Sequence, residues 1–257
     1  MKAPGFFLPH RYAERIRPPS SYPELEDLFA RAEPRMAAVL ALAEGFAREL
    51  AAMRGPAPEP RLDQDWFPRL DAAVAYALLR AFRPRLVLEI GSGHSTRFLA
   101  RALRDNGAGR LIAVDPEPRA ALPVVPVEHR ARLLGEAELA LAGALRAGDV
   151  LFVDASHLVV PGSDVDLLVC RVLPRLAPGV LVHLHDVFLP DAYPESWAAR
   201  GYNEHTVVAA LLAREGMRLL WASRYMLTRR GERIERGPLA ALPLVPGAFE
   251  TSLWLVA

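Results

Sequence analysis

From residue 71 onward, short apolar runs alternate with segments in which apolar residues recur every three or four positions. The short runs are typical of buried strands, and the periodic segments are typical of amphipathic helices. Strands are predicted at 86–90, 111–114, 124–127, 150–153 and 180–184, with helices at 71–82, 95–105, 136–145, 164–176 and 203–214. This alternation predicts an α/β fold, in which helices cover both faces of a largely parallel sheet.

Two late strands are predicted at 217–222 and 251–256, and no helix-type apolar pattern lies between them. Parallel strands need a long crossover connection, whereas antiparallel strands do not. Because the link 228–247 is rich in Arg, Gly and Pro, we expect no helix there and an antiparallel pair instead. The prediction is therefore a doubly wound, seven-stranded mixed sheet.

The N-terminal part has a different pattern. Residues 22–53 are helical in periodicity, and Pro34 either separates two helices or lies in the first turn of the second. The Gly- and Pro-rich stretch 55–60 is the best linker candidate. We predict that 1–60 is an arm with a helical extension, serving as a lid or an oligomer surface, and that 61–257 is one domain.

The use of lysine and cysteine argues against several classes of protein. Lys2 is the only lysine, and a terminal lysine does not suit a Walker-type phosphate loop, a protein kinase or a pyridoxal Schiff base. Cys170 is the only cysteine, so no intrachain disulfide and no multi-cysteine metal site can form. Its place in the apolar run 166–173 predicts a buried thiol.

Charge and hydropathy argue against two classes of binding partner. A formal net charge of +1 argues against a nucleic-acid partner, which usually requires a basic excess. The apolar run 36–43 ends at Glu44, well short of the roughly 18–20 residues that span a bilayer. No secretory signal is visible, so we expect a cytoplasmic protein without a membrane partner.

The sharpest motif is the turn Gly91-Ser-Gly93, between the strand at 86–90 and the helix at 95–105. Glycines let the backbone turn tightly and approach a ligand, and ligands bind at the carboxyl ends of such strands. A dinucleotide fingerprint requires Gly or Ala where Thr96 stands, so a ligand without phosphates fits better. Ser95 or Thr96 can cap the helix. Asp115 follows Gly91 by 24 residues, near the spacing of about 20 for a ribose-binding acid, although it could also cap a short helix.

Taken together, Glu89 to Thr96 and Val114-Asp115 resemble the first two cofactor motifs of class I S-adenosylmethionine-dependent methyltransferases. The stretch 151–157 resembles their fourth-strand motif, and the resemblance extends over roughly 65–257. It implies a Rossmann-like methyltransferase fold with S-adenosylmethionine as cofactor. The implied cofactor-binding residues are Glu89, Gly91, Gly93, His94, Ser95, Thr96, Asp115 and Asp154, with Asp115 at the ribose.

Acids and histidines follow the next two strands. Asp154 and His157 come after the fourth strand, and His183, His185 and Asp186 close the fifth. Because both strand ends should lie at one rim of the sheet, we expect Asp154, His185 and Asp186 to converge. Asp and His are ligands for divalent metals. His183 is expected to be a hydrogen-bonded core histidine rather than a ligand.

This cluster resembles that of metal-dependent O-methyltransferases related to catechol methyltransferase, and of bacterial sugar and macrolide O-methyltransferases. By that resemblance Asp154, His185 and Asp186 hold a divalent metal, Mg²⁺ or Mn²⁺. The sequence has His-Asp where the catechol enzymes have Asp-Asn, and histidine favours Mn²⁺, Fe²⁺ or Zn²⁺ over Mg²⁺.

The resemblance implies O-methylation of a hydroxylated small molecule, with Asp154, His157 and His185 as catalytic residues. A bound metal would lower the pKa of the acceptor hydroxyl, and a histidine base could do the same work alone. Two alternatives stay open: a nicotinamide-dependent oxidoreductase on a Rossmann-like fold, and a non-catalytic cofactor-binding protein. Whether the chain forms a homo-oligomer also stays open.

Overall fold

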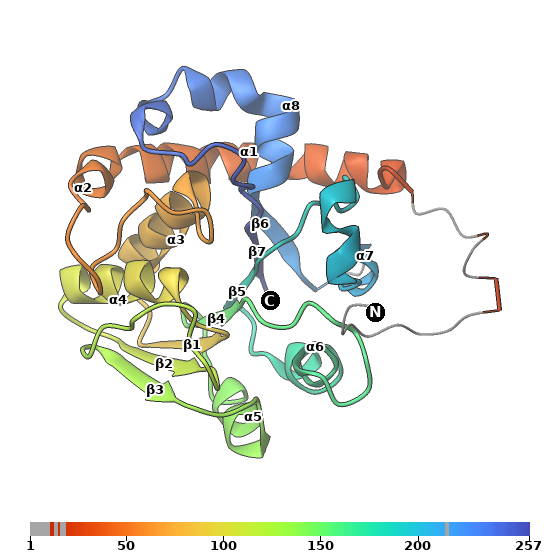
Figure 1. Ribbon diagram of the computed structural model, residues 1–257, viewed down its shortest axis with the longest axis horizontal. Helices are drawn as coiled ribbons and strands as arrows, with labels where there is room; N and C mark the ends of the chain where they lie inside the picture. Colours follow the sequence, from red (N-terminus) through yellow and green to blue (C-terminus); the bar gives the residue numbers. More distant parts are fainter. Residues whose placement is uncertain (1–10, 13–14, 16–18, 214–215) are drawn as a thin grey trace.

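In the computed structural model, which describes residues 11–12, 15, 19–213 and 216–257, one sheet organises the chain (Figure 1). Its strand order is β3-β2-β1-β4-β5-β7-β6. The strands are β1 (Leu86–Ile90), β2 (Arg110–Val114), β3 (Val127–Arg130), β4 (Val150–Val153), β5 (Leu181–Leu184), β6 (Arg218–Ala222) and β7 (Leu253–Val256). β1 to β5 are parallel, whereas β7 is antiparallel to both β5 and β6. The predicted seven-stranded mixed sheet and its antiparallel pair are confirmed.

Helices cover both faces of the sheet, with α1, α3 and α4 on one face and α5 and α6 on the other (Figure 1). Their bounds are α1 (Glu26–Glu44), α2 (Ala47–Ala51), α3 (Arg69–Phe82), α4 (His94–Asn106), α5 (Glu136–Ala142), α6 (Asp164–Leu167), α7 (His205–Ala213) and α8 (Ser223–Glu235). Short helical turns are η2 (Pro23–Leu25), η3 (Leu168–Val172), η4 (Leu173–Arg175), η5 (Glu195–Arg200) and η6 (Pro238–Ala241). None of the described helices combines the length and the apolar character needed to cross a membrane.

The strand register brings four strand ends to one level. Ile90 pairs with Val114 and with Val153, and Val153 pairs with Leu184. The residues that follow these positions therefore begin at the same edge of the sheet. That edge carries the glycine loop and the acid and histidine residues identified above.

The N-terminal helix belongs to the same hydrophobic core as the sheet. Phe29 and Met36 of α1 are fully buried, and α1 packs against α3 and β6. The expectation that Pro34 interrupts this segment is wrong, because α1 runs through it without a break. Burial of one whole face of α1 outweighs the cost of a proline inside a helix. The boundary at residue 60 and the role of 1–60 as a lid or oligomer surface stay predictions.

The expectation of no helix between the last two strands is wrong. α8 occupies the start of that link, but its strands are nevertheless antiparallel. Its buried positions include Tyr225, Met226 and Ile234, while arginines fill much of the rest. Arg229 and Arg230 form ion pairs with acids of neighbouring segments. The same arginines that hide the helical pattern in the sequence therefore help to hold the helix in place.

Two further expectations need correction. The segment 164–176 is not one regular helix: α6 is followed by a π-helical turn and a 3-10 turn that contains Pro174. Cys170 is exposed, not buried. Leu168 and Val172, four residues apart, take the buried side of the turn, so Cys170 between them faces outward. The third strand begins at Val127, where the expected strand ended.

Candidate functional site

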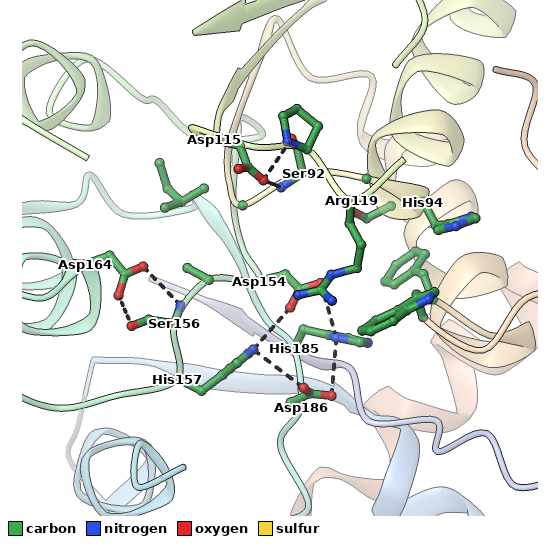
Figure 2. Close-up of a pocket in the computed structure, with 18 of the residues that line it drawn as sticks. Ser92, His94, Asp115, Arg119, Asp154, Ser156, His157, Asp164, His185 and Asp186 are labelled. Atoms are coloured by element: carbon green, nitrogen blue, oxygen red, sulfur yellow. Dashed lines mark hydrogen bonds and ion pairs between the residues drawn. The ribbon is translucent and has the colours of Figure 1, made fainter. Parts of the chain in front are cut away.

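A cavity of about 960 Å³ opens at the carboxyl ends of the parallel strands (Figure 2). Gly91 to Ser95 line it after β1, and Asp115 lines it after β2. Asp154 and His157 enter it after β4, and His185 and Asp186 after β5. The segments 65–67 and 247–249 close it from the sides. The cavity thus joins the predicted cofactor loop to the predicted acid and histidine cluster.

The glycine loop packs directly on the end of β4. Gly91 has φ +80°, and a Cβ built on it would lie 1.7 Å from the backbone oxygen of Asp154. Only glycine fits there, because any side chain would collide with this carbonyl. Helix α4 begins at His94 with Gly93 as its N-cap, so neither Ser95 nor Thr96 is the cap residue. Thr96, inside the first turn, instead accepts from the backbone N–H of Gly93 at 2.9 Å through its Oγ1. His94 and Ser95 line the cavity, whereas Thr96 is fully buried behind it.

Glu89 lies beneath this loop and is fully buried. Its Oε1 accepts a hydrogen bond from Ser95 Oγ at 2.7 Å, while its Oε2 has no partner among the described residues. Burial raises the pKa of Glu89 to about 8, helped by the charges of Asp154 and Asp115 and opposed by hydrogen bonds from Ser95 and Thr96. A buried carboxyl oxygen without a donor is costly, so this group is suited to a cationic partner at the loop.

Asp115 holds the loop from the side of β2. Its Oδ2 accepts from the backbone N–H of Ser92 at 2.6 Å and from Ser92 Oγ at 3.1 Å. Its Oδ1 accepts from the backbone N–H of Glu117 at 2.8 Å. Asp115 therefore holds a turn rather than the short helix that the second reading expected, and it also lines the cavity. Its contact with a ribose stays a prediction.

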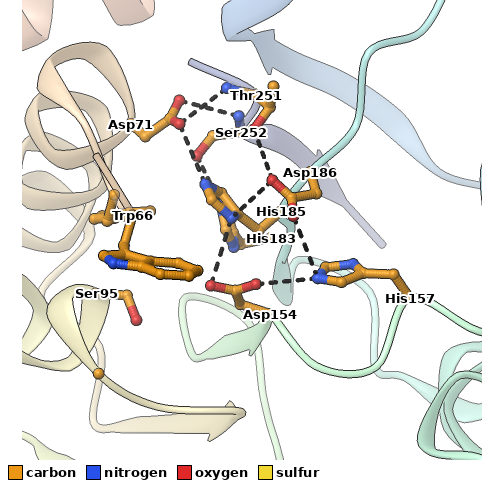
Figure 3. A network of polar contacts seen from close by, with 12 residues as sticks. Trp66, Asp71, Ser95, Asp154, His157, His183, His185, Asp186, Thr251 and Ser252 are labelled. Carbon is orange, nitrogen blue, oxygen red and sulfur yellow. Dashed lines mark hydrogen bonds and ion pairs between the residues drawn. The ribbon is translucent and has the colours of Figure 1, made fainter. Parts of the chain in front are cut away.

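The two histidines and two acids after β4 and β5 form a closed cluster (Figure 3). His157 Nε2 lies 3.3 Å from Asp154 Oδ1 and 3.5 Å from Asp186 Oδ2. His185 Nδ1 lies 3.4 Å from Asp154 Oδ2 and 3.5 Å from Asp186 Oδ1. The expected convergence of Asp154, His185 and Asp186 is therefore observed, and His157 joins them.

The ligand atoms closest to metal-site spacing come from a slightly different set. One atom each of Asp154, His157 and Asp186 lie within 4.8 Å of one another. His157 thus stands where the predicted set had His185, although His185 touches both acids. The left-handed bend at His157, with φ +59°, turns its ring toward the acids, and no strand-end argument reveals such a bend.

The outer nitrogen of each imidazole has its own buried carboxylate. His157 Nδ1 lies 2.6 Å from Glu204 Oε1, and His185 Nε2 lies 3.2 Å from Asp71 Oδ2. Asp71 is held in turn by further donors, namely the N–H groups of Thr251 and Ser252 and the hydroxyl of Ser223. These outer hydrogen bonds orient both rings so that their other nitrogens face Asp154 and Asp186 (Figure 3).

Sequence reasoning assigned no role to Asp71 or Glu204. Asp71 is a fully buried acid in the first turn of α3, and every residue from 70 to 79 is buried. An acid within such an apolar helix is a signal, because a buried charge needs a partner. Glu204 gave no comparable signal, since it precedes α7 in a polar stretch.

The charges of the cluster shift its pKa values strongly. Burial alone would lower the pKa of His157, but Glu204, Asp154 and Asp186 raise it well above its ordinary value. Burial also lowers the pKa of His185, but the charges of Asp154 and Asp186 more than offset this effect. The pKa of His185 therefore lies well above its ordinary value. In the absence of a bound cation, the surrounding acids therefore favour the imidazolium form of both rings.

His183 belongs to the core. It is fully buried, its ring stacks on Phe152 at 3.7 Å, and its Nε2 lies 2.8 Å from Ser252 Oγ. Burial, together with the charge on His185, lowers its pKa well below the ordinary value. It is the hydrogen-bonded core histidine that was expected, and it supports the packing beneath the cluster.

Backbone strain marks the same place. Asp186 has φ +54° and His157 has φ +59°, a left-handed conformation that is uncommon outside glycine. Such residues persist where the surroundings over-determine them, which happens often at functional sites. The side chains of these two residues meet, with His157 Nε2 lying 3.5 Å from Asp186 Oδ2.

Aromatic side chains line the cavity beside Asp186. Trp197, Tyr202 and Phe249 face it, and the Cζ atom of Arg200 stacks 3.8 Å from the centre of the Trp197 ring. The His157 and Tyr202 rings lie 4.5 Å apart. Phe188, by contrast, is fully buried and packs behind Trp197. The region after β5 therefore supplies an aromatic wall to the cavity.

Comparison with known proteins identifies the domain. Residues 88–187 match a family model described as a methyltransferase domain. A comparison with curated protein sequences found no match.

Several solved structures are similar at low identity. One is a methyltransferase from Geobacter sulfurreducens, with 18% identity, a TM-score of 0.40, and coverage of 85% of this chain and 87% of that chain. Another is an O-methyltransferase from Bacillus cereus in complex with SAH, with 16% identity, a TM-score of 0.38, and coverage of 92% and 96%. A third is the O-methyltransferase TomG from Streptomyces achromogenes, involved in tomaymycin synthesis and in complex with SAM, with 22% identity, a TM-score of 0.37, and coverage of 70% and 80%.

TM-scores of this size show neither a common substrate nor a common metal site. The family match, however, covers the glycine loop, the acid after β2 and the cluster after β4 and β5. The match agrees with the resemblance of these motifs to methyltransferases: residues 88–187 of this chain are similar to a methyltransferase domain.

Proposed function

We propose that the protein transfers the methyl group of S-adenosylmethionine to a hydroxyl oxygen of a small molecule. The observation that carries this proposal is the single cavity that joins the glycine loop to the acid and imidazole cluster. A cofactor at the loop would present its methyl group toward the cluster, where an acceptor hydroxyl needs to lose a proton. We include in the proposal a cytoplasmic location and action without a nucleic-acid or membrane partner.

The residues at the loop fit the cofactor. The carboxylate of Asp154, which lines the cavity, suits the ammonium group of its methionine part, and Glu89 with its unpaired Oε2 lies buried beneath the loop. Gly91 leaves no side chain in the way, and Asp115, which lines the cavity after β2, suits the hydroxyl groups of the ribose. When bound, the cofactor supplies a sulfonium whose methyl group is already activated for transfer.

The cluster also fits a divalent cation. Asp154, His157 and Asp186 would hold it, with His185 beside them. On the side that faces the cavity, both histidine rings form ion-pair contacts with Asp154 and Asp186. On the opposite side, each ring forms a hydrogen bond with another carboxylate, that of Glu204 or Asp71. An outer carboxylate on each ring is the usual support of a metal-binding histidine. A bound cation would lower the pKa of the acceptor hydroxyl.

The chain's own groups then complete the proton transfer. Because His157 would be a ligand of the cation, we assign the base to His185: the positive charge of the cation would disfavour its imidazolium form, and its neutral Nδ1 at the inner face of the cluster would take the acceptor proton. Glu204 and Asp71 keep these two rings turned toward the cavity and stabilise their protonated forms. The aromatic wall of Trp197, Tyr202 and Phe249 excludes water from the acceptor.

Calorimetry tests the proposal directly. We expect S-adenosylhomocysteine to bind with micromolar or tighter affinity, which corresponds to about −8 kcal/mol. NAD is the comparison ligand, because a nicotinamide-dependent oxidoreductase is the main alternative. Tight binding of NAD without binding of S-adenosylhomocysteine would overturn the proposal. Binding of the cofactor without methyl transfer to any hydroxylated acceptor would instead favour a non-catalytic binding protein.

A further inference from the structure

Arg200 lies on the wall of the cavity and has no part in the chemistry described so far. It is the last residue of the short turn η5, which adds no buried side chain to the core. Side chains three residues apart lie on the same side of a 3-10 helix, and this spacing places Arg200 beside Trp197. Both side chains line the cavity, so η5 presents one aromatic ring and one cation to a bound molecule.

Aromatic rings hold the guanidinium group of Arg200. Its Cζ atom lies 3.8 Å from the centre of the Trp197 ring and 5.5 Å from the centre of the Tyr202 ring. Its Nη1 also donates to the hydroxyl oxygen of Tyr202 over 3.4 Å, which is long for a hydrogen bond. A stacked ring contacts only the face of a guanidinium, so N–H groups at the edge remain available to an anion.

Asp186 is the only acid among the described residues that forms an ion pair with Arg200, and this contact is long. Arg200 Nη1 lies 4.0 Å from Asp186 Oδ2, beyond hydrogen-bond distance. The same oxygen lies 3.5 Å from His157 Nε2, so Asp186 is shared with the cluster. Arg132, which also lines the cavity, differs because its Nε lies 3.4 Å from the buried acid Glu138. Arg200 thus keeps a free edge close to the place where the acceptor hydroxyl would lose its proton.

The charges at this end of the cavity favour a negative ligand. A divalent cation in the cluster would balance the carboxylates of Asp154 and Asp186 that surround it. Arg200 then adds one positive charge to the cavity wall that no carboxylate balances closely. Charge complementarity selects one ligand over another, so an acceptor with a single negative group near its hydroxyl fits this wall better than a neutral alcohol.

We propose that the methyl acceptor is a hydroxy acid, and that Arg200 binds its carboxylate while its hydroxyl group lies at the cluster. This inference rests on the proposed function, since it takes the cluster as the place where the acceptor hydroxyl is deprotonated. Two N–H groups at one edge of the guanidinium can pair with both carboxylate oxygens. Trp197 keeps the guanidinium in place for that contact. Arg200 is therefore a residue that determines specificity for the acceptor.

Pairs of ligands that differ only in the charge of one group test this assignment. 3-Hydroxybenzoate and 3-hydroxybenzamide form an aromatic pair, and 3-hydroxybutyrate and 3-hydroxybutyramide form an aliphatic pair. Calorimetry on the full chain saturated with S-adenosylhomocysteine measures each affinity without methyl transfer. We expect the wild-type protein to bind the acid of at least one pair about 5- to 20-fold more tightly than its amide. Arg200→Gln should reduce this ratio to below about 2, whereas Arg200→Lys should keep part of it, because lysine retains the charge without the planar fork.

Arg132→Gln is the matched control, since Arg132 lines the same cavity but already has an acidic neighbour. It should leave the ratio of the two affinities at the wild-type value. The assignment is overturned if the wild-type protein prefers neither acid to its amide, or if Arg200→Gln weakens acid and amide equally or leaves both unchanged. Either result with S-adenosylhomocysteine still bound would leave the proposed function intact. A folded wild-type chain that does not bind S-adenosylhomocysteine would instead overturn the proposed function, and the assignment with it.

Discussion

Glu204 is the single residue whose charge most affects His157. Its carboxylate is the first of the neighbouring groups that raise the pKa of that histidine. Glu204→Gln keeps the shape and a hydrogen-bond acceptor but removes the charge, so we expect the pKa of His157 to fall toward its ordinary value. Imidazole NMR titration of the protein in a chelating buffer measures this shift. Glu136→Gln, which changes an exposed acid paired with Arg171, is the control, and an unchanged pKa of His157 in Glu204→Gln would contradict the assignment.

His205 makes the stability of the fold depend on pH, because its pKa is lowered in the folded protein, whereas that of His157 is raised. Its Nε2 accepts from the backbone N–H of Phe188 at 2.9 Å, and burial lowers its pKa to about 3. The unfolded chain takes up this proton near the ordinary pKa of about 6.5, whereas the folded chain resists until pH 3. The stability that depends on neutral His205 is therefore complete above about pH 6.5 and is lost progressively as the pH falls toward 3.

His205→Gln should remove that dependence while keeping an acceptor for Phe188. Between pH 7 and pH 5 we expect the free energy of unfolding of the wild-type protein to fall by about 2 kcal/mol more than that of the variant. Urea denaturation at the two pH values measures the difference. The raised pKa values of His157 and His185 affect the free energy of unfolding in the opposite direction. Both residues are present in the two proteins, so their contribution cancels in the difference. Parallel pH dependences in the two proteins would show that His205 does not resist protonation.

Among the elements, α1 tests how far packing overrides local preference. Pro34 is exposed in the interior of this helix, where it removes a backbone hydrogen bond. Pro34→Ala should raise the free energy of unfolding by about 1–3 kcal/mol, and thermal denaturation would show it as a higher Tm. Ala38→Pro, at another exposed position of α1, is the reverse control and should destabilise the protein by about 3 kcal/mol or more. A Tm unchanged by Pro34→Ala would mean that the helix already adjusts to the proline.

The elements also show which parts of the fold a sequence can predict. The buried parallel strands were predictable, because each is a short apolar run bounded by turn residues. α8 was not, since its few apolar positions are spread among arginines whose acidic partners lie elsewhere in the chain. The same limit applies to the site. Asp154 and His185 follow from strand ends, but the contact of His185 with Asp71 joins positions 114 residues apart and leaves no periodic trace.

At the scale of the whole molecule, the cavity is assembled from segments spread over most of the chain, from 65–67 to 247–249. A ligand that binds only this assembled state stabilises the entire fold, by about 2.7 kcal/mol at a concentration of one hundred times Kd. Thermal unfolding can therefore report occupancy of the cofactor end and of the cluster separately. Asp154 lies between the two ends, whereas Asp186 belongs to the cluster alone.

We expect S-adenosylhomocysteine and Mn²⁺ each to raise the Tm of the wild-type protein. Asp186→Asn should abolish the Mn²⁺ shift and keep the cofactor shift, because asparagine tolerates the left-handed backbone at this position while a neutral amide is a weaker metal ligand. Asp154→Asn should reduce both shifts, since Asp154 faces both ends of the cavity. If millimolar Mn²⁺, Mg²⁺ or Zn²⁺ leaves the wild-type Tm unchanged and activity survives exhaustive chelation, the cluster holds no metal. One imidazolium ring would then face Asp154 and Asp186, and the other histidine, as a neutral imidazole, would have to take the acceptor proton alone.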